Sequence, residues 1–471
     1  MIYDFFTQYY WEIGIILFFY FFTVNFLTMV VSLVGGYNAL KEFKELNKDN
    51  VIKNLKSNSL PKIAMIVPAY NESEIIVECL KNLHDISYHN KEIILVNDGS
   101  TDNTLQLLIE AFNLEQTPVE VKRILKTKLI RGVYKSKCFP DITVIDKENG
   151  LKHDALNAGL NVCSCDYVIT IDADTFIDSN QFESIIRPLY MHPETIAVGV
   201  GVRIANYSTL KYHSISLDAF RGNYFIAMQS LEYLRLFMIR QGFNYFGGNF
   251  CLSGAFTAFS YKALMNVEGF APTFANDLEI IIRLHRYYLE KKIPYKIVQL
   301  SEPVAWTHVP ENYKTLKHQR ILWHRGLLES LWFHKRLFFT QEYNIFGFFV
   351  LNFALFAEAL EPIIELIAYF YVALGVYLGL ISWTLLIVII GLSWGCTLLA
   401  SLFAYMIEVF TYKKYRFNGN FFKLIAYSFI ENFGYRQMTI FWRIQGFLSF
   451  YKRFEEVKKD YQVINARFRY E

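Results

Sequence analysis

Residues 63–72 read IAMIVPAYNE, residues 93–100 read IILVNDGS and residues 167–174 read YVITIDAD. Each stretch begins with a short run of almost only apolar residues, and residues 196–200 form a fourth such run. Runs of this kind are typical of parallel strands that helices cover on both faces. Amphipathic segments lie between the runs, so the sequence predicts an α/β domain over about residues 61 to 299.

Polar and acidic residues follow the predicted strands. Asp98 comes after the second strand, and Asp172 and Asp174 come after the third. Ligands of parallel sheets bind outside the carboxyl ends of the strands, and carboxylates gathered there repel each other unless a cation or hydrogen-bond donors offset their charge. The pattern predicts a ligand site in which one carboxylate of the DAD triplet reaches a ribose or diphosphate and the other holds a divalent metal. Such triplets are common in loops, so this interpretation depends on companion motifs.

A first membrane span is predicted near the N-terminus. Residues 11–36 contain one acidic residue, Glu12, and no basic residue, and they reach the ~20 apolar residues that a crossing needs. The first twelve residues carry Asp4 and Glu12 and no Lys or Arg, which is unlike a cleaved signal peptide. By the positive-inside rule, the lysines after the span place its carboxyl end in the cytoplasm. They are Lys41, Lys44, Lys48, Lys53 and Lys56.

A second apolar region covers residues 346–410, and residues 362–380 and 383–405 each suit one crossing. Residues 346–360 are too few for a span and include Glu358, so we expect them at the membrane interface. The basic residues after this region are expected in the cytoplasm, which predicts three spans in total. These basic residues are Lys413, Lys414 and Arg416.

Two acids, Glu361 and Glu365, lie at the start of the second predicted span. Ionised carboxylates are costly in a bilayer unless they face protein or water. The simplest interpretation is that this helix begins at the level of the lipid headgroups.

Composition excludes several classes of protein. Of 471 residues, 53% are hydrophobic and 19% are charged, compared with about 25% charged in soluble domains. The net charge of +3 gives no global field for nucleic acid, which we do not expect as a partner. Six cysteines without a CxxC pair argue against a disulfide framework and a structural zinc site. No Walker lysine motif or GxGxxG follows a strand, so NTPase and dehydrogenase activities lack their signature.

More motifs follow the strand-end motifs in order. They are Lys152 within NGLKHDALNAGL, SGAF at residues 253–256, NDLE at residues 276–279 and QRILW at residues 319–323. In this order they resemble the inverting family-2 glycosyltransferases, and the last motif is similar to the QxxRW box of membrane-bound processive polysaccharide synthases, of the cellulose, hyaluronan and poly-N-acetylglucosamine synthase kind. The resemblance covers about residues 61 to 326. It implies a GT-A-type Rossmann-like nucleotide-sugar domain with interfacial helices and transmembrane α-helices.

The resemblance also implies roles for the matched residues. On the donor side these are Tyr70 and Glu72 at the nucleotide base, Asp98 at the nucleoside, typically a uridine, Lys152 and Asp172 at the diphosphate, and Asp174 as the ligand of Mg²⁺ or Mn²⁺. On the acceptor side they are Ser253, Gly254, Gln319 and Trp323. His153, and Leu151 where the family often has glycine, depart from the usual pattern.

Asp277 is the candidate catalytic base. An acceptor hydroxyl needs a base within hydrogen-bond reach as it attacks the anomeric carbon. Asp277 begins an amphipathic helix, whose dipole is expected to keep the carboxylate ionised. The alternatives are that Asp277 is only the helix N-cap, or that Glu279 is the base.

Residues 313–332 form a predicted helix on the membrane surface, with Gln319 and Trp323 on one face. Leu322 stands where the family has an arginine, so another cation must meet the diphosphate. Arg325 is the preferred substitute because it projects to the same side, and Arg320 is the alternative. The helix could also be only a basic interfacial helix with Trp323 as an anchor.

Three functions remain open from the sequence. The first is a processive β-linked polysaccharide synthase that uses a UDP-sugar, and the second is a single transfer to a polyprenyl-phosphate or lipid acceptor. The third is a membrane scaffold with a degenerate nucleotide fold. The expected partners are the nucleotide-sugar donor, a glycan or lipid-linked acceptor and the bilayer, with an oligomer or export partner if a polymer crosses.

The predicted organisation places a multi-pass protein in the plasma or inner membrane with a cytoplasmic catalytic domain. Its segments are residues 1–40 as a transmembrane helix, 41–310 as the GT-A domain, 311–360 as interfacial helices, 361–411 as two transmembrane helices, and 412–471 as a cytoplasmic interfacial segment and tail.

Overall fold

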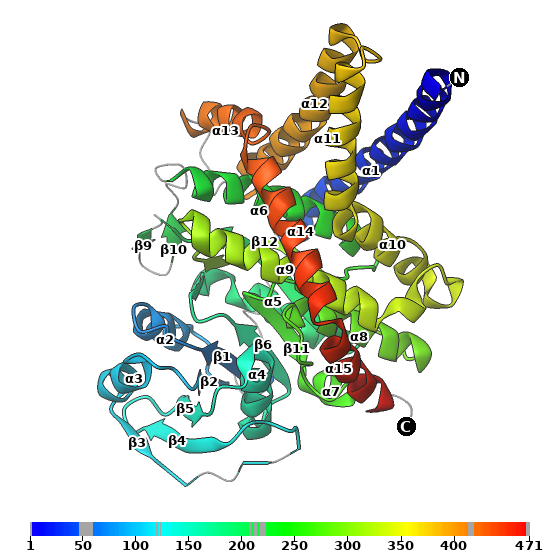
Figure 1. Cartoon of the computed structure of the whole chain (residues 1–471). Coiled ribbons are helices and arrows are strands. Elements are labelled where there is room, and N and C mark those ends of the chain that lie inside the picture. Colours follow the sequence, from blue (N-terminus) through cyan, green and yellow to red (C-terminus); the bar gives the residue numbers. More distant parts are fainter. Residues whose placement is uncertain are drawn as a thin grey trace.

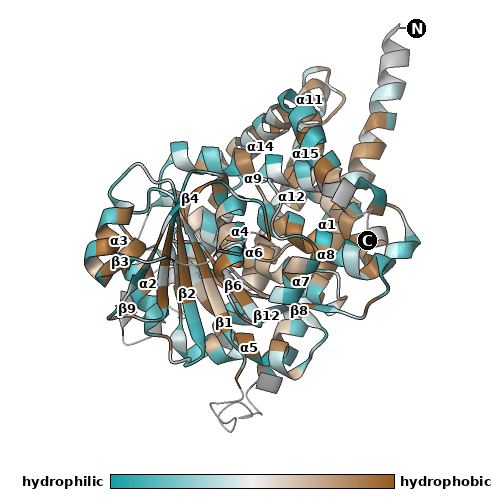
Figure 2. Cartoon of the chain, turned by 90° about the horizontal axis from the view of Figure 1, so that it is seen from below, coloured by the Kyte–Doolittle hydropathy of each residue, from teal (hydrophilic) through white to brown (hydrophobic). Residues whose placement is uncertain are grey.

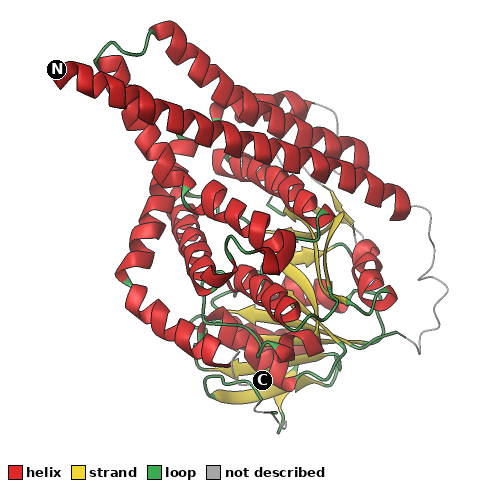
Figure 3. Cartoon of the chain, turned by 90° about the vertical axis from the view of Figure 1, so that its right-hand side faces the viewer, coloured by secondary structure: helices red, strands yellow, loops and turns green. Residues whose placement is uncertain are grey.

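The computed structural model describes residues 2–46, 60–118, 121–122, 124–206, 209–211, 214–216, 223–412 and 419–467. In space, the strands lie at one end of the molecule and the long apolar helices lie at the other end (Figure 1 and Figure 3). Some basic residues used to predict topology lie outside the described ranges. These are Lys48, Lys53, Lys56, Lys413, Lys414 and Arg416.

A mixed ten-stranded sheet forms the centre of the α/β part, in the order β3-β4-β5-β2-β1-β6-β11-β8-β12-β7. Its strands are β1 (Ile63–Ala69), β2 (Lys91–Asp98), β3 (Leu114–Gln116), β4 (Ile130–Ser136), β5 (Ile142–Lys147), β6 (Tyr167–Ile171), β7 (Thr175–Ile177), β8 (Thr195–Ile204), β11 (Phe256–Ser260) and β12 (Lys296–Thr307). A separate pair consists of β9 (Thr209–Lys211) and β10 (Ser214–Ser216).

The four predicted strands correspond to β1, β2, β6 and β8. The first three pair in parallel, as expected. Between β6 and β8 lies β11, which the sequence analysis did not predict as a strand and which runs antiparallel to both neighbours. Because Phe256 at the start of β11 pairs with Ile171 at the end of β6, the preceding SGAF loop lies at the same sheet edge as Asp172.

Helices cover both faces of the sheet, so the predicted α/β class is confirmed. One face packs against α2 (Ile76–His84), α3 (Thr104–Phe112) and α5 (Phe182–Met191). The other packs against α4 (Leu151–Val162), α7 (Tyr261–Asn266) and α8 (Asn276–Glu290). The strand residues between these layers are almost fully buried, and Figure 2 shows hydrophobic residues along the strands.

The remaining long helices are α6 (Tyr224–Tyr245), α9 (Tyr313–Phe333), α13 (Gly419–Ile430), α14 (Tyr435–Lys452) and α15 (Phe454–Arg467). Of these, α6, α9 and α14 lie between the sheet and the apolar helices (Figure 1). Helix α14 packs along α9, and α6 packs against α1. A Cβ added at Gly35 of α1 would come within 2.0 Å of the Met238 oxygen of α6, so the two backbones meet where only glycine fits.

The apolar helices are α1 (Ile2–Leu46), α11 (Glu361–Tyr377) and α12 (Trp383–Ile407). By length and composition, two segments suit a membrane crossing, Tyr9–Lys44 and Trp383–Thr411. A third span results if α11 and the preceding Phe346–Ala359 count as one helix with a 46° bend. That preceding segment consists of π-helical turns, Phe346–Val350 and Ala354–Ala359, around α10 (Leu351–Phe353). Further short turns are Ser179–Gln181, Lys335–Leu337, Gln341–Tyr343 and Glu408–Tyr412.

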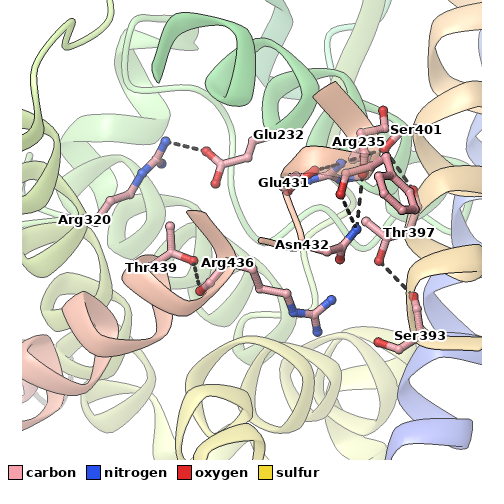
Figure 4. A network of polar contacts seen from close by, with 12 residues as sticks. Glu232, Arg235, Arg320, Ser393, Thr397, Ser401, Glu431, Asn432, Arg436 and Thr439 are labelled. Carbon is pink, nitrogen blue, oxygen red and sulfur yellow. Dashed lines mark hydrogen bonds and ion pairs between the residues drawn. The ribbon is translucent and has the colours of Figure 1, made fainter. Parts of the chain in front are cut away.

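Helices α11 and α12 form an apolar hairpin, and ion pairs connect it to the rest of the chain. Arg203 at the end of β8 donates to Glu408 after α12 from Nε at 2.9 Å and from Nη2 at 2.5 Å, and both side chains are buried. Arg235 of α6 donates to both oxygens of Glu431 at 2.8 and 2.5 Å and to Ser401 of α12 at 2.7 Å (Figure 4). The α/β part and the hairpin are therefore joined by paired charges as well as by apolar contacts.

Candidate active site

A pocket of about 490 Å³ opens at the carboxyl ends of β1, β2 and β6. Its lining includes every donor-side residue predicted from the sequence except Arg325. The lining residues are Pro68, Ala69, Tyr70, Glu72, Asp98, Asn149, Leu151, Lys152, Ala155, Asp172, Ala173 and Asp174. Tyr70 is 49% exposed at this pocket. The sheet thus brings together side chains that lie up to about a hundred residues apart in the sequence.

Carboxylates crowd one side of this pocket. Burial raises the pKa of Glu72 to about 7, with further contributions from Asp174 and Asp172. Burial and the charge of Asp172 raise the pKa of Asp174 to about 6, although Thr307 Oγ1 donates a hydrogen bond to Asp174 Oδ1 at 3.0 Å. Groups with raised pKa values hold their negative charge reluctantly, so this side of the pocket is suited to a cation.

Lys152 connects the carboxylates with the SGAF loop. Its Nζ donates to Asp172 Oδ1 and lies 3.4 Å from the Gly254 carbonyl oxygen. Burial alone would lower its pKa, but the charges of Asp172 and Asp277 raise it. Lys152 is therefore a cation that lies next to Asp172 and the Gly254 carbonyl and within the electrostatic influence of Asp277.

The backbone before Lys152 has an unusual conformation. Leu151 has φ of 70°, a value that favours glycine, and its side chain is 56% exposed at the pocket. The sequence departure at Leu151 therefore falls on a position where glycine would be less strained.

Asp98 is held by residues that the sequence analysis did not single out. Lys147 Nζ, which is fully buried, lies 2.5 Å from Asp98 Oδ1 and 2.6 Å from Asp154 Oδ1. The Gly150 N–H donates to the same Asp98 oxygen at 3.0 Å, and Asn149 donates to the Asp98 carbonyl at 2.9 Å. The available signal was Lys147 two residues after the apolar run 142–145, because a lysine buried at a strand end needs a carboxylate partner.

A smaller cavity adjoins the main pocket through Lys152, and Ser253, Gly254, Asn276 and Asp277 line it. Helix α8 begins at Asn276 with Ala275 as N-cap, so Asp277 is not the capping residue. Burial raises the pKa of Asp277, and Lys152 and Arg240 offset this only in part. Burial of the carboxyl therefore outweighs the neighbouring groups that lower this pKa.

Glu279 does not reach this site. It is fully buried, accepts from Arg283 Nη2 at 2.8 Å, and its other oxygen lies 3.1 Å from His334 Nε2. Burial alone would raise its pKa, but Arg283 and His334 lower it. The structure therefore gives Glu279 a structural pairing in place of the alternative role as base.

Helix α9 differs from expectation at both arginines. Arg325 is buried, bonds to Glu329 at 2.7 Å and lies over the Phe274 ring, so the pocket does not include it. Arg320 pairs with Glu232 of α6 at 2.5 Å (Figure 4). Its guanidinium also lies over the Trp323 ring. The partner of Arg325 lies four residues on in the same helix, whereas that of Arg320 comes from α6, which spacing along α9 does not show.

Gln319 and Trp323 differ in their surroundings. Trp323 is 41% exposed on α9, with Arg320 over one face of its ring. The Oε1 atom of Gln319 is buried and has no hydrogen-bond partner among the described residues. The exposed part of Trp323 is therefore available to a further group on this face of α9.

The carboxylates of Asp172 and Asp174 are the candidate ligands of a divalent metal ion. Within the described residues, no group of three or more His, Cys, Asp or Glu side chains is arranged to hold a metal ion. Asp172 and Asp174 offer only oxygen ligands, which suit Mg²⁺ or Mn²⁺, and these ions commonly complete their coordination with water and substrate phosphates. The residues therefore fit an ion that binds together with a phosphorylated ligand.

Two family models match the chain. Residues 64–267 match the model described as "Glycosyl transferase family 2". Residues 167–411, more than half of the chain, match the model described as "Glycosyl transferase family group 2".

Individual proteins are similar as well. The poly-beta-1,6-N-acetyl-D-glucosamine synthase of Staphylococcus aureus (strain COL) is 31% identical over 329 residues, which cover 68% of this chain and 65% of the relative. That of Staphylococcus epidermidis is 27% identical over 340 residues, which cover 70% of this chain and 66% of the relative. The chain therefore spans about two thirds of the length of these relatives. A solved mannosyltransferase from Pyrobaculum calidifontis in complex with GDP-Man and Mn²⁺ aligns with a TM-score of 0.49 and 16% identity over 88% of this chain and 98% of that chain.

Proposed function

This chain belongs to glycosyl transferase family 2, and from that membership we propose that it is a membrane-bound inverting enzyme that adds sugars from a UDP-sugar to a growing β-linked polysaccharide. One observation carries the proposal. The pocket in which Asp98, Lys152, Asp172 and Asp174 meet adjoins the cavity of Asp277. The larger pocket can therefore bind the leaving diphosphate on one side of Lys152, and Asp277 can act as the base for the acceptor on the other side.

In this proposal the donor lies in the larger pocket. Tyr70 and Glu72 contact the base at the rim, and Asp98 binds the nucleoside with its carboxylate oriented by Lys147. Lys152 moves from Asp172 onto the diphosphate, because the diphosphate carries more negative charge than one carboxylate.

Asp174 and Asp172 would hold Mg²⁺ or Mn²⁺ together with the diphosphate oxygens. When bound, the ion supplies Lewis-acid stabilisation of the negative charge on the leaving diphosphate. The raised pKa of Asp174 supports this role, since a cation is what the crowded carboxylates lack.

The reaction is a single displacement. The acceptor hydroxyl oxygen forms a bond to the anomeric carbon while the bond from that carbon to the diphosphate oxygen breaks. Asp277 takes the hydroxyl proton, and Lys152 stabilises the departing UDP. Attack from the side opposite the diphosphate inverts the anomeric centre, so an α-linked donor gives a β-linked product.

The acceptor approaches past Ser253 and Gly254, with Gln319 and Trp323 as contacts on α9. An indole ring presents a flat apolar face to a sugar, and Trp323 is exposed enough to do so. The apolar helices anchor the enzyme in the bilayer, and the positive-inside rule places the catalytic part in the cytoplasm.

A donor screen with product sizing tests the proposal. Membranes containing the chain are incubated with radiolabelled UDP-sugars and Mg²⁺ or Mn²⁺, beginning with UDP-N-acetylglucosamine because the similar relatives are named for a poly-N-acetylglucosamine product. We expect UDP release and a product of many sugars. A product of one sugar on lipid would support single transfer, and no UDP release with any donor would favour the scaffold.

A further inference from the structure

A buried arginine lies against the exposed tryptophan of α9. The guanidinium carbon of Arg320 is 4.4 Å from the centre of the Trp323 ring. Arg320 is 8% exposed, whereas Trp323 is 41% exposed. The two residues are three apart in the sequence and therefore lie on the same side of the helix. Arg320 thus covers the face of the indole that is turned toward the protein, and the exposed part of Trp323 lies on the other side.

Helix α6 holds Arg320 in this position. The Nη2 atom of Arg320 donates to Glu232 Oε2 at 2.5 Å, and both side chains are mostly buried. Arg235 follows Glu232 by one turn of α6, and it donates to both oxygens of Glu431 (Figure 4). The charge of Arg235 also acts on Glu232. The carboxylate that binds Arg320 is therefore itself fixed between an arginine of α9 and an arginine of α6.

Helix α14 packs closely on α9 beside this pair. A Cβ added at Gly446 of α14 would come within 2.8 Å of the Ile321 carbonyl oxygen, so the two helices meet where only glycine fits. Tyr435 at the start of α14 is 1% exposed, and the charges of Glu232 and Arg320 both act on it. Three helices thus meet around Arg320, which restricts its side chain to one conformation.

Trp323 lies one helical turn from the place where α9 meets the start of α8. A Cβ added at Gly326 would come within 2.5 Å of the backbone nitrogen of Ala275, the N-cap of α8. Gly326 follows Trp323 by three residues, so the two share a side of α9 and are about 4.5 Å apart along its axis. Trp323 is therefore on the side of α9 that contacts the first turn of α8, where Asp277 lies.

The contact with Arg320 limits how a sugar can bind to Trp323. An indole has two flat faces on which a sugar ring can stack. A guanidinium is planar and can stack on one of these faces, whereas an ammonium group is a point charge. Because Arg320 occupies one face, only the other remains, and the direction of that face depends on the Arg320–Glu232 pair.

We propose that Arg320 is a positioning residue for the acceptor: held by Glu232, it fixes the Trp323 ring so that one face is presented to the terminal acceptor sugar. This inference rests on the proposed function. It replaces the diphosphate role considered for Arg320, whose guanidinium is bound to Glu232 and does not line the larger pocket. Arg320 therefore controls the affinity for the acceptor and not the affinity for the donor.

Arg320→Lys separates positioning of the ring from charge pairing. Lysine can still pair with Glu232, so the fold should be kept, but its ammonium group cannot stack flat on the indole. UDP release by the full chain in detergent is measured at varied donor and at varied concentrations of short oligosaccharides purified from the enzyme's own product. We expect the KM for the oligosaccharide to rise roughly three- to thirtyfold, as for loss of a cation–π contact, with nearly unchanged donor KM and Tm.

Arg203→Lys is the matched control. Arg203 is also buried, pairs with Glu408 at 2.5 Å and lies 4.6 Å from the centre of the Phe237 ring. It is not on α9 and lines neither the larger pocket nor the smaller cavity. The same exchange of a stacked guanidinium for an ammonium group should therefore leave both KM values unchanged.

A double-mutant cycle tests whether Arg320 acts through Trp323. Trp323→Ala alone should raise the KM for the oligosaccharide, because the stacking surface is lost. Adding Arg320→Lys should then change this KM by no more than about twofold, since the ring that Arg320 positions is absent. A further rise as large as that seen with Trp323 present would show that Arg320 does not act through the indole.

Other results would overturn the inference in recognisable ways. A raised donor KM in the Arg320→Lys variant would assign Arg320 to the diphosphate, and a lower Tm with both KM values unchanged would show an ion pair of structural importance only. An active enzyme whose rate does not respond to the oligosaccharide would mean that Trp323 holds no glycan. If the unaltered chain releases no UDP from any donor, it is the proposed function that fails.

Discussion

At the scale of single residues, burial raises the pKa of one carboxyl group of α8, Asp277, and an ion pair holds another, Glu279. Asp277 is half-buried beside Lys152 and its pKa is raised, which makes it a stronger base once it is ionised. Glu279, two residues later, is locked between Arg283 and His334. The same helix turn therefore separates a carboxylate available for chemistry from one committed to structure.

Asp277→Asn should lower transfer by about 10²- to 10⁴-fold, because an amide cannot accept the acceptor proton. Binding of UDP should change little, since Asp277 lies in the smaller cavity. Initial rates of UDP release and UDP titration by calorimetry measure the two effects. Full activity of the variant would remove Asp277 as the base.

Metal binding should depend on pH through Asp174, a proposed ligand, and through the nearby charge of Glu72. The pKa values of these two groups, about 6 and about 7 in that order, mean that protons compete with a cation below pH 7. Affinity for Mn²⁺ should therefore rise as pH increases from about 5 to 8, with proton release on binding near pH 6. Calorimetry in buffers of different ionisation enthalpy measures this release, and Glu72→Gln should flatten the upper part of the pH dependence. An affinity that does not vary with pH would contradict the carboxylate site.

At the scale of elements, α8 and β11 position the reaction. Antiparallel β11 brings Ser253 and Gly254 to the carboxyl edge of β6, and α8 starts opposite them. A Cβ at Gly254 would lie 2.9 Å from Asp277 Oδ2, so glycine allows the loop and the helix to approach.

Glu279→Gln tests the internal pairing of α8. Breaking a buried ion pair costs about 3–5 kcal/mol of unfolding free energy, so the variant should show a clearly lower Tm in detergent. Activity per folded molecule should remain near that of the unaltered enzyme. Glu290→Gln on the same helix is the control, because Glu290 is 35% exposed and exposed pairs contribute about 0–1 kcal/mol. A stable but inactive Glu279→Gln variant would restore Glu279 as the base.

At the scale of the whole molecule, paired charges join the apolar hairpin to the catalytic part. Arg203 and Glu408 are 1% and 0% exposed, and Arg235 binds both Glu431 and Ser401. Because these pairs connect β8 and α6 with the end of α12, movement of the hairpin would shift helices that border the site.

For the buried Arg203–Glu408 pair, we expect a single variant to lose more stability than a double variant that replaces both charges. Glu408→Gln leaves a buried guanidinium unpaired and should destabilise the protein by about 3–5 kcal/mol. The double variant Arg203→Met with Glu408→Met should recover much of that loss, since two apolar side chains replace both charges. Thermal unfolding in detergent measures the pattern. Equal losses in the single and double variants would show that packing, not charge pairing, fixes the hairpin here.

The sequence alone determined the α/β class, the apolar segments and the residues that meet in the larger pocket. These follow from local pattern, because strand ends, apolar runs and motif order are properties of neighbouring residues and because parallel strands bring their carboxyl ends to one edge. Only the tertiary structure decided which charges are free. Arg320 pairs with Glu232 of α6, Glu279 lies next to His334 after α9, and Glu361 and Glu365 pair with arginines of α14. Those partners come from elements distant in the chain, and spacing within one helix does not show which elements pack against it. The pairs Arg325–Glu329 and Glu279–Arg283 are i,i+4 contacts within one helix, so their spacing was visible in the sequence.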